Sequence, residues 1–103
     1  MKMEFIFDDA KLKKEGITKD WALDQIRAFF KACGREAIQE AEEGVFVAPI
    51  SEVAYFGAAC SFKRKKWFIR TIKEWYWTDE DSSWERKDVL ESLAQIRKNV
   101  YGE

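Results

Sequence analysis

The chain of 103 residues contains no histidine, one proline, two cysteines and five scattered glycines. Without histidine, the Ser-His-Asp and Cys-His catalytic arrangements and the histidine-containing zinc sites are excluded. Cys33 and Cys60 are too few to complete a zinc site made of cysteines alone. No glycine-rich loop of the kind that holds phosphate occurs. We therefore expect the protein not to be an enzyme, and to need no cofactor and no metal.

Long apolar runs are also lacking, since no segment approaches the roughly 18 residues that a membrane-spanning helix needs. The first apolar residues meet Asp8 and Asp9 almost at once, which is unlike a signal peptide. Cys33 and Cys60 share no short spacing and have apolar neighbours, which favours two buried thiols over a disulfide. These features predict a cytoplasmic protein without membrane contact.

Length and composition predict one compact domain over residues 1–103. Hydrophobic residues make up 47% of the chain and aromatic residues 16%. A chain of this length can bury about two-thirds of the surface that it exposes when unfolded. The content of five Trp, eight Phe and three Tyr is more than such a small domain easily buries completely.

Charge is segregated along the chain, although the formal net charge is only −1. Residues 36–60 contain five acidic residues and no Lys or Arg, whereas residues 61–77 contain six Lys or Arg and one acidic residue. Such blocks either pair within the fold or face different partners.

Two short apolar segments, residues 4–7 and 45–48, have the composition of β-strands and are natural partners. A two-stranded sheet alone is marginal in water, so helices must cover it. Four segments show apolar residues at helical spacing: 19–33, 52–64, 66–77 and 84–98. We predict an α+β fold that is mostly helical, with about four helices packed on a two-stranded sheet. Thr18 and Ser51 are the predicted N-caps of the first two helices.

Three segments also fit a second type of secondary structure. Residues 35–43 fit a helix or a weak strand, and residues 52–64 fit a strand less well than a helix. For residues 66–77, helical spacing collects the apolar side chains on one side better than strand alternation does. The rival for this last segment is a β-hairpin that turns at Lys63–Lys66.

A run of cations and aromatic rings between Phe62 and Trp77 is the most conspicuous feature. On a helix, Lys66, Arg70 and Lys73 would share one exposed face. Trp67 and Trp77 fall at or beyond the edge of the apolar face, and Trp21 is marginal on its own helix. The candidate partner-binding residues are Lys63, Arg64, Lys65, Lys66, Trp67, Arg70, Lys73 and Trp77.

Aromatic residues and arginine are enriched at interface hot spots, and the neighbouring cations suit an acidic partner. The leading hypothesis is a non-enzymatic interaction or regulatory module that binds a protein partner, or a second copy of the chain. In the competing interpretation these tryptophans belong to the core. We predict that Trp77→Ala abolishes partner capture without unfolding the domain.

Two other functions are kept. Cations beside indoles are typical of proteins that bind single-stranded nucleic acid, because cations contact phosphates and rings stack on bases. The net negative charge and Glu74 within the run weigh against this alternative. The third is a carboxylate-metal enzyme that uses Asp79, Glu80 and Asp81, although the same residues fit a solvated loop before a helix.

Overall fold

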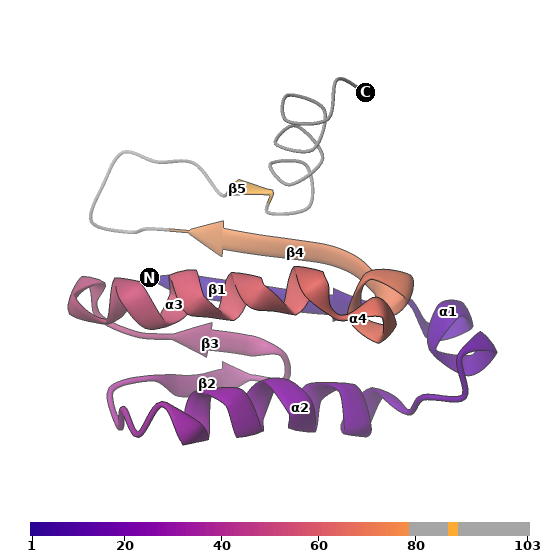
Figure 1. Ribbon diagram of the computed structural model, residues 1–103. Coiled ribbons are helices and arrows are strands. Elements are labelled where there is room, and N and C mark those ends of the chain that lie inside the picture. Colours follow the sequence, from indigo (N-terminus) through magenta and orange to yellow (C-terminus); the bar gives the residue numbers. More distant parts are fainter. Residues whose placement is uncertain (79–86, 89–103) are drawn as a thin grey trace.

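A computed structural model describes residues 1–78 and 87–88, and all structural statements concern these residues. The elements follow one another as β1 (Lys2–Phe7), α1 (Asp9–Lys14), α2 (Lys19–Ala32), β2 (Gln39–Glu42), β3 (Val45–Val47), η1 (Ile50–Glu52), α3 (Val53–Ala59), η2 (Cys60–Arg64), α4 (Lys66–Thr71), β4 (Ile72–Thr78) and β5 (Lys87–Asp88). The two elements named η are short 3₁₀ helices. Figure 1 shows their arrangement.

The sheet has the strand order β2-β3-β1-β4-β5, and every pairing is antiparallel. The predicted pairing of residues 4–7 with 45–48 is confirmed, because β1 pairs with β3. The predicted sheet of two strands is wrong. Four strands lie within residues 1–78, and the two-residue β5 adds to the outer side of β4. The α+β class is confirmed. The described residues contain four α-helices, but one of them, α1, lies outside the four predicted helical segments.

The unpredicted strand β4 occupies the second half of the segment predicted as a helix over 66–77. The helix α4 ends at Thr71, whose buried hydroxyl donates to the carbonyl of Trp67 at 2.6 Å. Ile72 then adopts an extended conformation, and β4 pairs along β1 from Ile72 to Thr78. Helical spacing failed here because the free edge of β1, a long-range partner, satisfies the backbone of this stretch. The rival hairpin at Lys63–Lys66 is also wrong, since η2 and α4 flank Lys65.

The first predicted helix is confirmed as α2, and its cap forms as expected. The Thr18 hydroxyl accepts a hydrogen bond from the Trp21 amide at 3.1 Å. The helical prediction for 52–64 holds as η1, α3 and η2 in succession, but Ser51 caps nothing. In the open segment 35–43, residues 39–42 form the strand β2.

The predicted helix over residues 84–98 lies outside the described residues except at Lys87 and Asp88. These two residues pair with Trp77 and Tyr76 as strand β5, so the prediction is wrong at these positions. The acidic cluster Asp79-Glu80-Asp81 also lies outside the described part of the chain.

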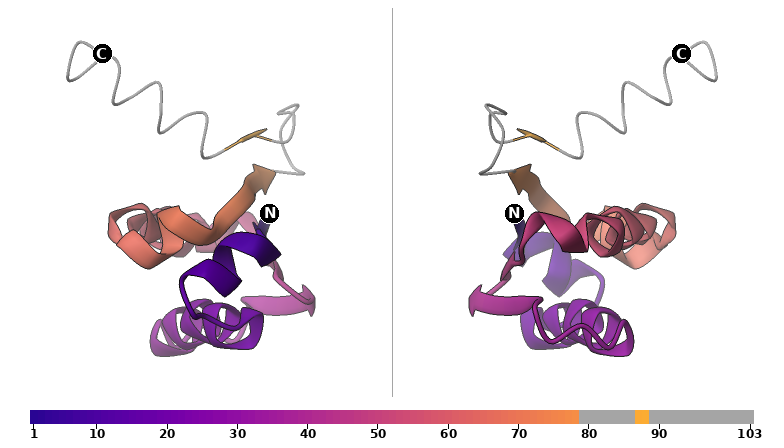
Figure 2. Two further views of the ribbon diagram at one scale, coloured as in Figure 1. Left: turned by 90° about the vertical axis from the view of Figure 1, so that its right-hand side faces the viewer. Right: turned by 90° about the vertical axis from the view of Figure 1, so that its left-hand side faces the viewer.

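The core lies between one face of the sheet and the helices. Alternate residues of β1, Met3, Phe5 and Phe7, are buried and meet Trp75 of β4 on the same face. Figure 2 shows α2, α3 and α4 together on that side of the sheet. The buried rings of these helices and of η2, Phe30, Phe56, Phe62 and Phe68, complete one aromatic core. Burial on this scale is the main stabilising contribution in a domain of this size.

Candidate protein-interaction surface

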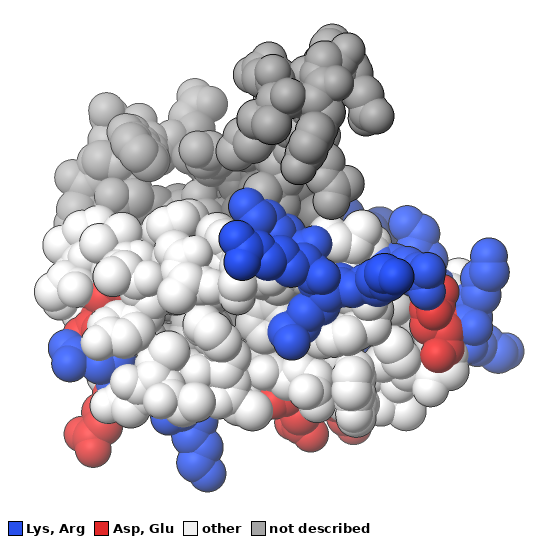
Figure 3. All heavy atoms as spheres, in the orientation of Figure 1, with Lys and Arg blue, Asp and Glu red and all other residues white. Residues whose placement is uncertain are grey.

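The predicted cations Lys63, Arg64, Lys65 and Lys66 lie where η2 passes into α4. Arg64, Lys65 and Lys66 are exposed, and Lys63 is half-buried. No ion pair joins any of the four to a carboxylate within the described residues. Figure 3 shows Lys and Arg side chains gathered over the end of α3 and over α4. Among residues 1–78, no carboxylate therefore compensates these four adjacent positive charges.

Trp67, in the first turn of α4, is held at the edge of the core. Its ring stacks on Phe7 at a centroid distance of 6.3 Å and an interplanar angle of 22°. Edge contacts with Phe62 and Phe68 hold it further. The ring is half-buried, so Trp67 belongs partly to the core and partly to the surface. Its packing supports the core interpretation, and its role in partner binding stays a prediction.

Trp21 completes the aromatic part of the surface. It lies in the first turn of α2, and its ring meets that of Trp67 at 5.0 Å in an edge arrangement. Trp21 is 44% exposed, and no other aromatic residue is among the large hydrophobic side chains exposed in residues 1–78. We call the set formed by Trp21, Trp67, Lys63–Lys66 and Arg70 the basic-aromatic surface.

The remaining predicted residues lie in different places. Arg70 is exposed on α4 with Lys66, as predicted, and forms an ion pair of 3.9 Å with Glu15. Lys73 is exposed but lies in β4, so it does not share a helix face with Lys66 and Arg70. The expected stack of three cations at helical spacing is therefore reduced to two.

Trp77 is brought to the opposite end of β1 from Trp67. It pairs with Met3, whereas Trp67 stacks on Phe7. Four residues of extended chain separate Met3 from Phe7, which corresponds to about 13 Å. Trp77 is half-buried and contacts Phe56 at 6.2 Å between ring centroids. Its surroundings are thus those of a core-edge residue, at the other end of β1 from Trp67.

Sequence reasoning gave Trp21 only a marginal place and left α1 out of the candidate site. The contact of Trp21 with Trp67 joins positions 46 residues apart, which no local pattern encodes. The signal in the sequence was composition alone, because rings at the margin of an apolar stripe are the ones that remain accessible.

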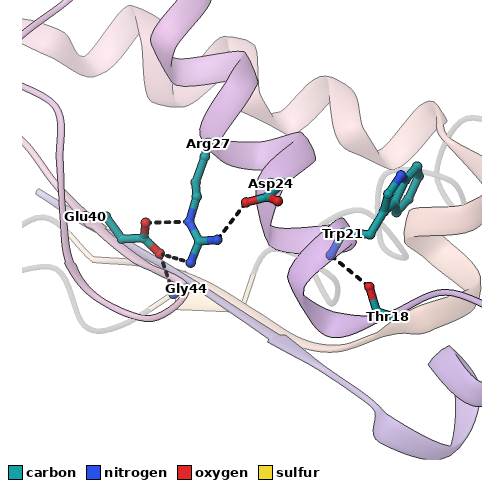
Figure 4. Close-up of polar contacts among 6 residues, drawn as sticks. All are labelled: Thr18, Trp21, Asp24, Arg27, Glu40 and Gly44. Carbon is teal, nitrogen blue, oxygen red and sulfur yellow. Dashed lines mark hydrogen bonds and ion pairs between the residues drawn. The ribbon is translucent and has the colours of Figure 1, made fainter.

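Two acidic residues, Asp24 and Glu40, are paired with Arg27 within the fold. Arg27 of α2 donates to both carboxylate oxygens of Glu40 at 2.7 and 3.0 Å and to Asp24 at 2.8 Å (Figure 4). Glu40 also accepts from the Gly44 amide at 3.1 Å. The hydrogen bonds from Arg27 hold the pKa of the Glu40 carboxyl below its ordinary value. This network fastens α2 to the β2–β3 turn.

A groove of about 450 Å³ opens beside this network, between the end of α2 and β2. Two of its cations are already paired, Arg27 with Glu40 and Arg35 with Glu52. Both signs of charge line it, so it offers no consistent preference for a ligand. The described residues contain no group of three or more carboxylates or thiols placed to hold a metal ion.

Comparison with protein-family models, curated proteins and solved structures found no match. Both cysteines carry free, half-buried thiols. Among the helices of the described part, none has the length and apolar character to cross a bilayer.

Proposed function

We propose that this chain is a non-enzymatic interaction module that binds a protein partner through the basic-aromatic surface, in a reducing cytoplasm. The observation that carries the proposal is the position of Trp21. An indole that is 44% exposed rests against the half-buried Trp67, and Trp67 directly follows four cations that lack a carboxylate partner in the described chain. An aromatic anchor on a rigid base with a charged rim is the usual composition of an interface hot spot.

The rigid base supports this function energetically. Trp67 is fixed by Phe7, Phe62 and Phe68, so a partner that contacts Trp21 meets a surface that is already ordered. Binding to an ordered surface avoids much of the entropy cost of fixing side chains, about 0.5–1.5 kcal/mol for each flexible one.

Single-stranded nucleic acid is the weaker candidate for the same surface. Proteins of that type stack successive bases on several open rings. In residues 1–78, Trp21 alone among the aromatic residues counts as exposed, and Trp67 already stacks on Phe7. One accessible ring beside cations supports phosphate contact but offers no series of stacking platforms.

The test is quantitative capture of partner proteins from a lysate of the source cells by immobilised chain. We expect Trp21→Ala combined with Lys65→Glu to lose a partner that the original chain captures. Lys31→Glu, which reverses an exposed charge in the last turn of α2, is the matched control and should retain it. Circular dichroism checks that each variant folds.

Equal capture by the Trp21→Ala, Lys65→Glu variant would contradict the proposal. So would a tryptophan-fluorescence titration in which single-stranded DNA or RNA quenches strongly at low salt and weakly at physiological salt, since that result assigns the surface to nucleic acid. Sedimentation of the pure chain identifies the case in which the partner is a second copy.

A further inference from the structure

The short helix α1 lies directly beside α4, although more than fifty residues separate them in sequence. The amide of Asp8 donates to the carbonyl of Thr71 at 2.8 Å, which joins the start of α1 to the end of α4. Arg70 of α4 reaches Glu15, the residue that follows α1, at 3.9 Å. These contacts place a second group of charges next to the basic-aromatic surface.

Helix α1, beside this face, carries three exposed cations, Lys11, Lys13 and Lys14, and one exposed acid, Asp9. Its one apolar side chain that is buried, Leu12, points into the core and fixes which side of α1 faces outward. Lys11 lies one turn before Glu15 and therefore on the side of α1 that Arg70 approaches. Figure 3 shows that the cations over α4 continue towards α1.

Certain acidic side chains and the cations of α1, η2 and α4 differ in their ion pairs within the described chain. Glu40, Glu43 and Glu52 each have a cation within 2.7–3.1 Å, contributed by Arg27, Lys19 and Arg35. The cations of α1, η2 and α4 have a single carboxylate contact, the long pair of Arg70 with Glu15. Three of the five acidic residues in the block 36–60 are thus paired with cations, whereas in the described chain the exposed cations of α1, η2 and α4 outnumber the one carboxylate that pairs with them. A partner that complements this face must bring negative charge.

We propose that α1 and the basic-aromatic surface form one binding site for an acidic polypeptide segment of a partner protein, and that Glu15 limits its affinity by holding Arg70. This inference rests on the proposed function and names the chemistry of the partner. The partner segment carries carboxylates for the cations of α1 and α4, and an apolar side chain for Trp21.

The ion pair of Arg70 with Glu15 has the properties of a contact that a partner can replace. At 3.9 Å it is at the long end for an ion pair, and the Arg70 side chain is 60% exposed. Exposed pairs of this kind contribute little to stability, so exchanging Glu15 for a partner carboxylate costs little. Free Arg70 can then bind the partner carboxylate through two parallel hydrogen bonds.

The experiment uses the whole chain and a fluorescein-labelled peptide of alternating Glu and Leu, with a Gln and Leu peptide as the uncharged probe. Fluorescence anisotropy measures both affinities at low and physiological salt. We expect the Glu peptide to bind and the Gln peptide not to bind. Glu15→Gln should tighten binding of the Glu peptide about threefold, and Arg70→Gln should weaken it by a similar factor. In the Arg70→Gln background, Glu15→Gln should have a smaller effect.

The charge-matched control is Glu36→Gln, an exposed residue beyond the far end of α2. The fourteen residues of α2 span about 21 Å, so this change alters net charge without touching α1 or α4. If Glu36→Gln tightened binding as much as Glu15→Gln, net charge alone would explain the effect and the role of Glu15 would be refuted. Tighter binding of a single-stranded oligonucleotide than of the Glu peptide would also overturn the inference.

The peptide-binding assay and the lysate capture assay distinguish failure of the acidic-segment inference from failure of the proposed function. If the Glu peptide does not bind but the lysate partner is still lost with Trp21→Ala and Lys65→Glu, the protein-binding function stands and the acidic-segment inference is wrong. If neither assay responds to the surface variants, both are wrong.

Discussion

The carboxylate of Glu52 is 3% exposed and accepts two hydrogen bonds from the guanidinium of Arg35, at 2.8 and 2.9 Å. Arg35 lies in the loop after α2, and Glu52 ends η1, so this pair fixes the chain segment that leads into α3. Arg35 also lies over the ring of Tyr55 at 5.3 Å. A buried carboxylate needs such a partner, because an unpaired charge inside a protein is strongly unfavourable.

This pair predicts how stability depends on acid. The hydrogen bonds from Arg35 hold the pKa of Glu52 below its ordinary value of 4.5. A carboxyl group with a lowered pKa in the folded state stabilises the fold above its unfolded pKa, and this contribution is lost as the pH falls through the folded pKa. We therefore expect the free energy of unfolding to decline below pH 4.5, and to decline less in Glu52→Gln. Urea denaturation at several pH values measures both.

Glu42→Gln is the matched control for this experiment, because Glu42 is an exposed carboxylate on the neighbouring strand β2. The control should keep the acid dependence of the original chain. Arg35→Gln should lower stability at neutral pH, because it leaves a buried carboxylate unpaired, and part of this loss should be recovered as the pH falls and Glu52 takes up a proton. An acid profile that is the same in Glu52→Gln and in the original chain would show that this pair is not responsible.

In the turn between β2 and β3, a single methyl group added at Gly44 should lower the free energy of unfolding strongly. Gly44 has a φ of +78°, and an added Cβ would lie 2.7 Å from the backbone oxygen of Phe5. Gly34 has a similar φ of +68°, but nothing lies within 4 Å of its Cβ position. We expect Gly34→Ala to cost about 1 kcal/mol of unfolding free energy for its backbone conformation alone. Gly44→Ala should cost about 3 kcal/mol or more, because backbone must also move. Equal losses in thermal denaturation would contradict this steric account.

Loss of the N-cap of α2 should lower the free energy of unfolding by a smaller amount. Thr18 accepts the hydrogen bond from the Trp21 amide at 3.1 Å, and its replacement by alanine leaves that amide without this acceptor. We expect Thr18→Ala to lower the free energy of unfolding by about 1 kcal/mol, and Thr18→Ser to retain most of it. Since Trp21 is in this first turn, Thr18→Ala should also weaken partner capture, whereas Thr18→Ser should not. Urea midpoints and the capture assay provide the two measurements.

We expect Trp77→Ala and Trp21→Ala to have opposite effects on stability and on partner capture. Trp77→Ala removes a half-buried ring that packs on Phe56, and should cost about 2 kcal/mol of stability. Trp21→Ala removes a ring that is 44% exposed and should cost about 1 kcal/mol or less, mainly its contact with Trp67. Partner capture should follow Trp21 and not Trp77. Loss of capture in a folded Trp77→Ala variant would instead support the role first predicted for Trp77.

Local rules worked where local chemistry decides the structure. Thr18 and the spacing of apolar residues defined α2, because both the cap and the amphipathic face are properties of a few neighbouring residues. The strands β1 and β3 and their pairing were visible for the same reason, as short apolar segments between turn residues. The run Lys63–Lys66, of which three residues are exposed, was equally visible, because four consecutive cations cannot all be buried.

Local rules failed where a distant segment supplies the partner. The residues of β4 fit a helix by spacing, yet they form a strand because β1 offers a second edge to pair with. Glu52 carries a charge that usually stays at the surface, yet it is buried because Arg35 pairs with it across seventeen positions. Neither outcome can be deduced from the neighbours of these residues.

By itself, the sequence determined the α+β class, the helix α2, the pairing of the two apolar strands and the presence of a basic run. It did so through propensity, spacing and charge, which act over a few residues. The tertiary structure alone decided that Trp21 meets Trp67, that Trp77 lies at the other end of β1, and that α1 joins α4 in one face. The physical reason is that burial and long-range pairing depend on contacts between segments that only the folded chain brings together.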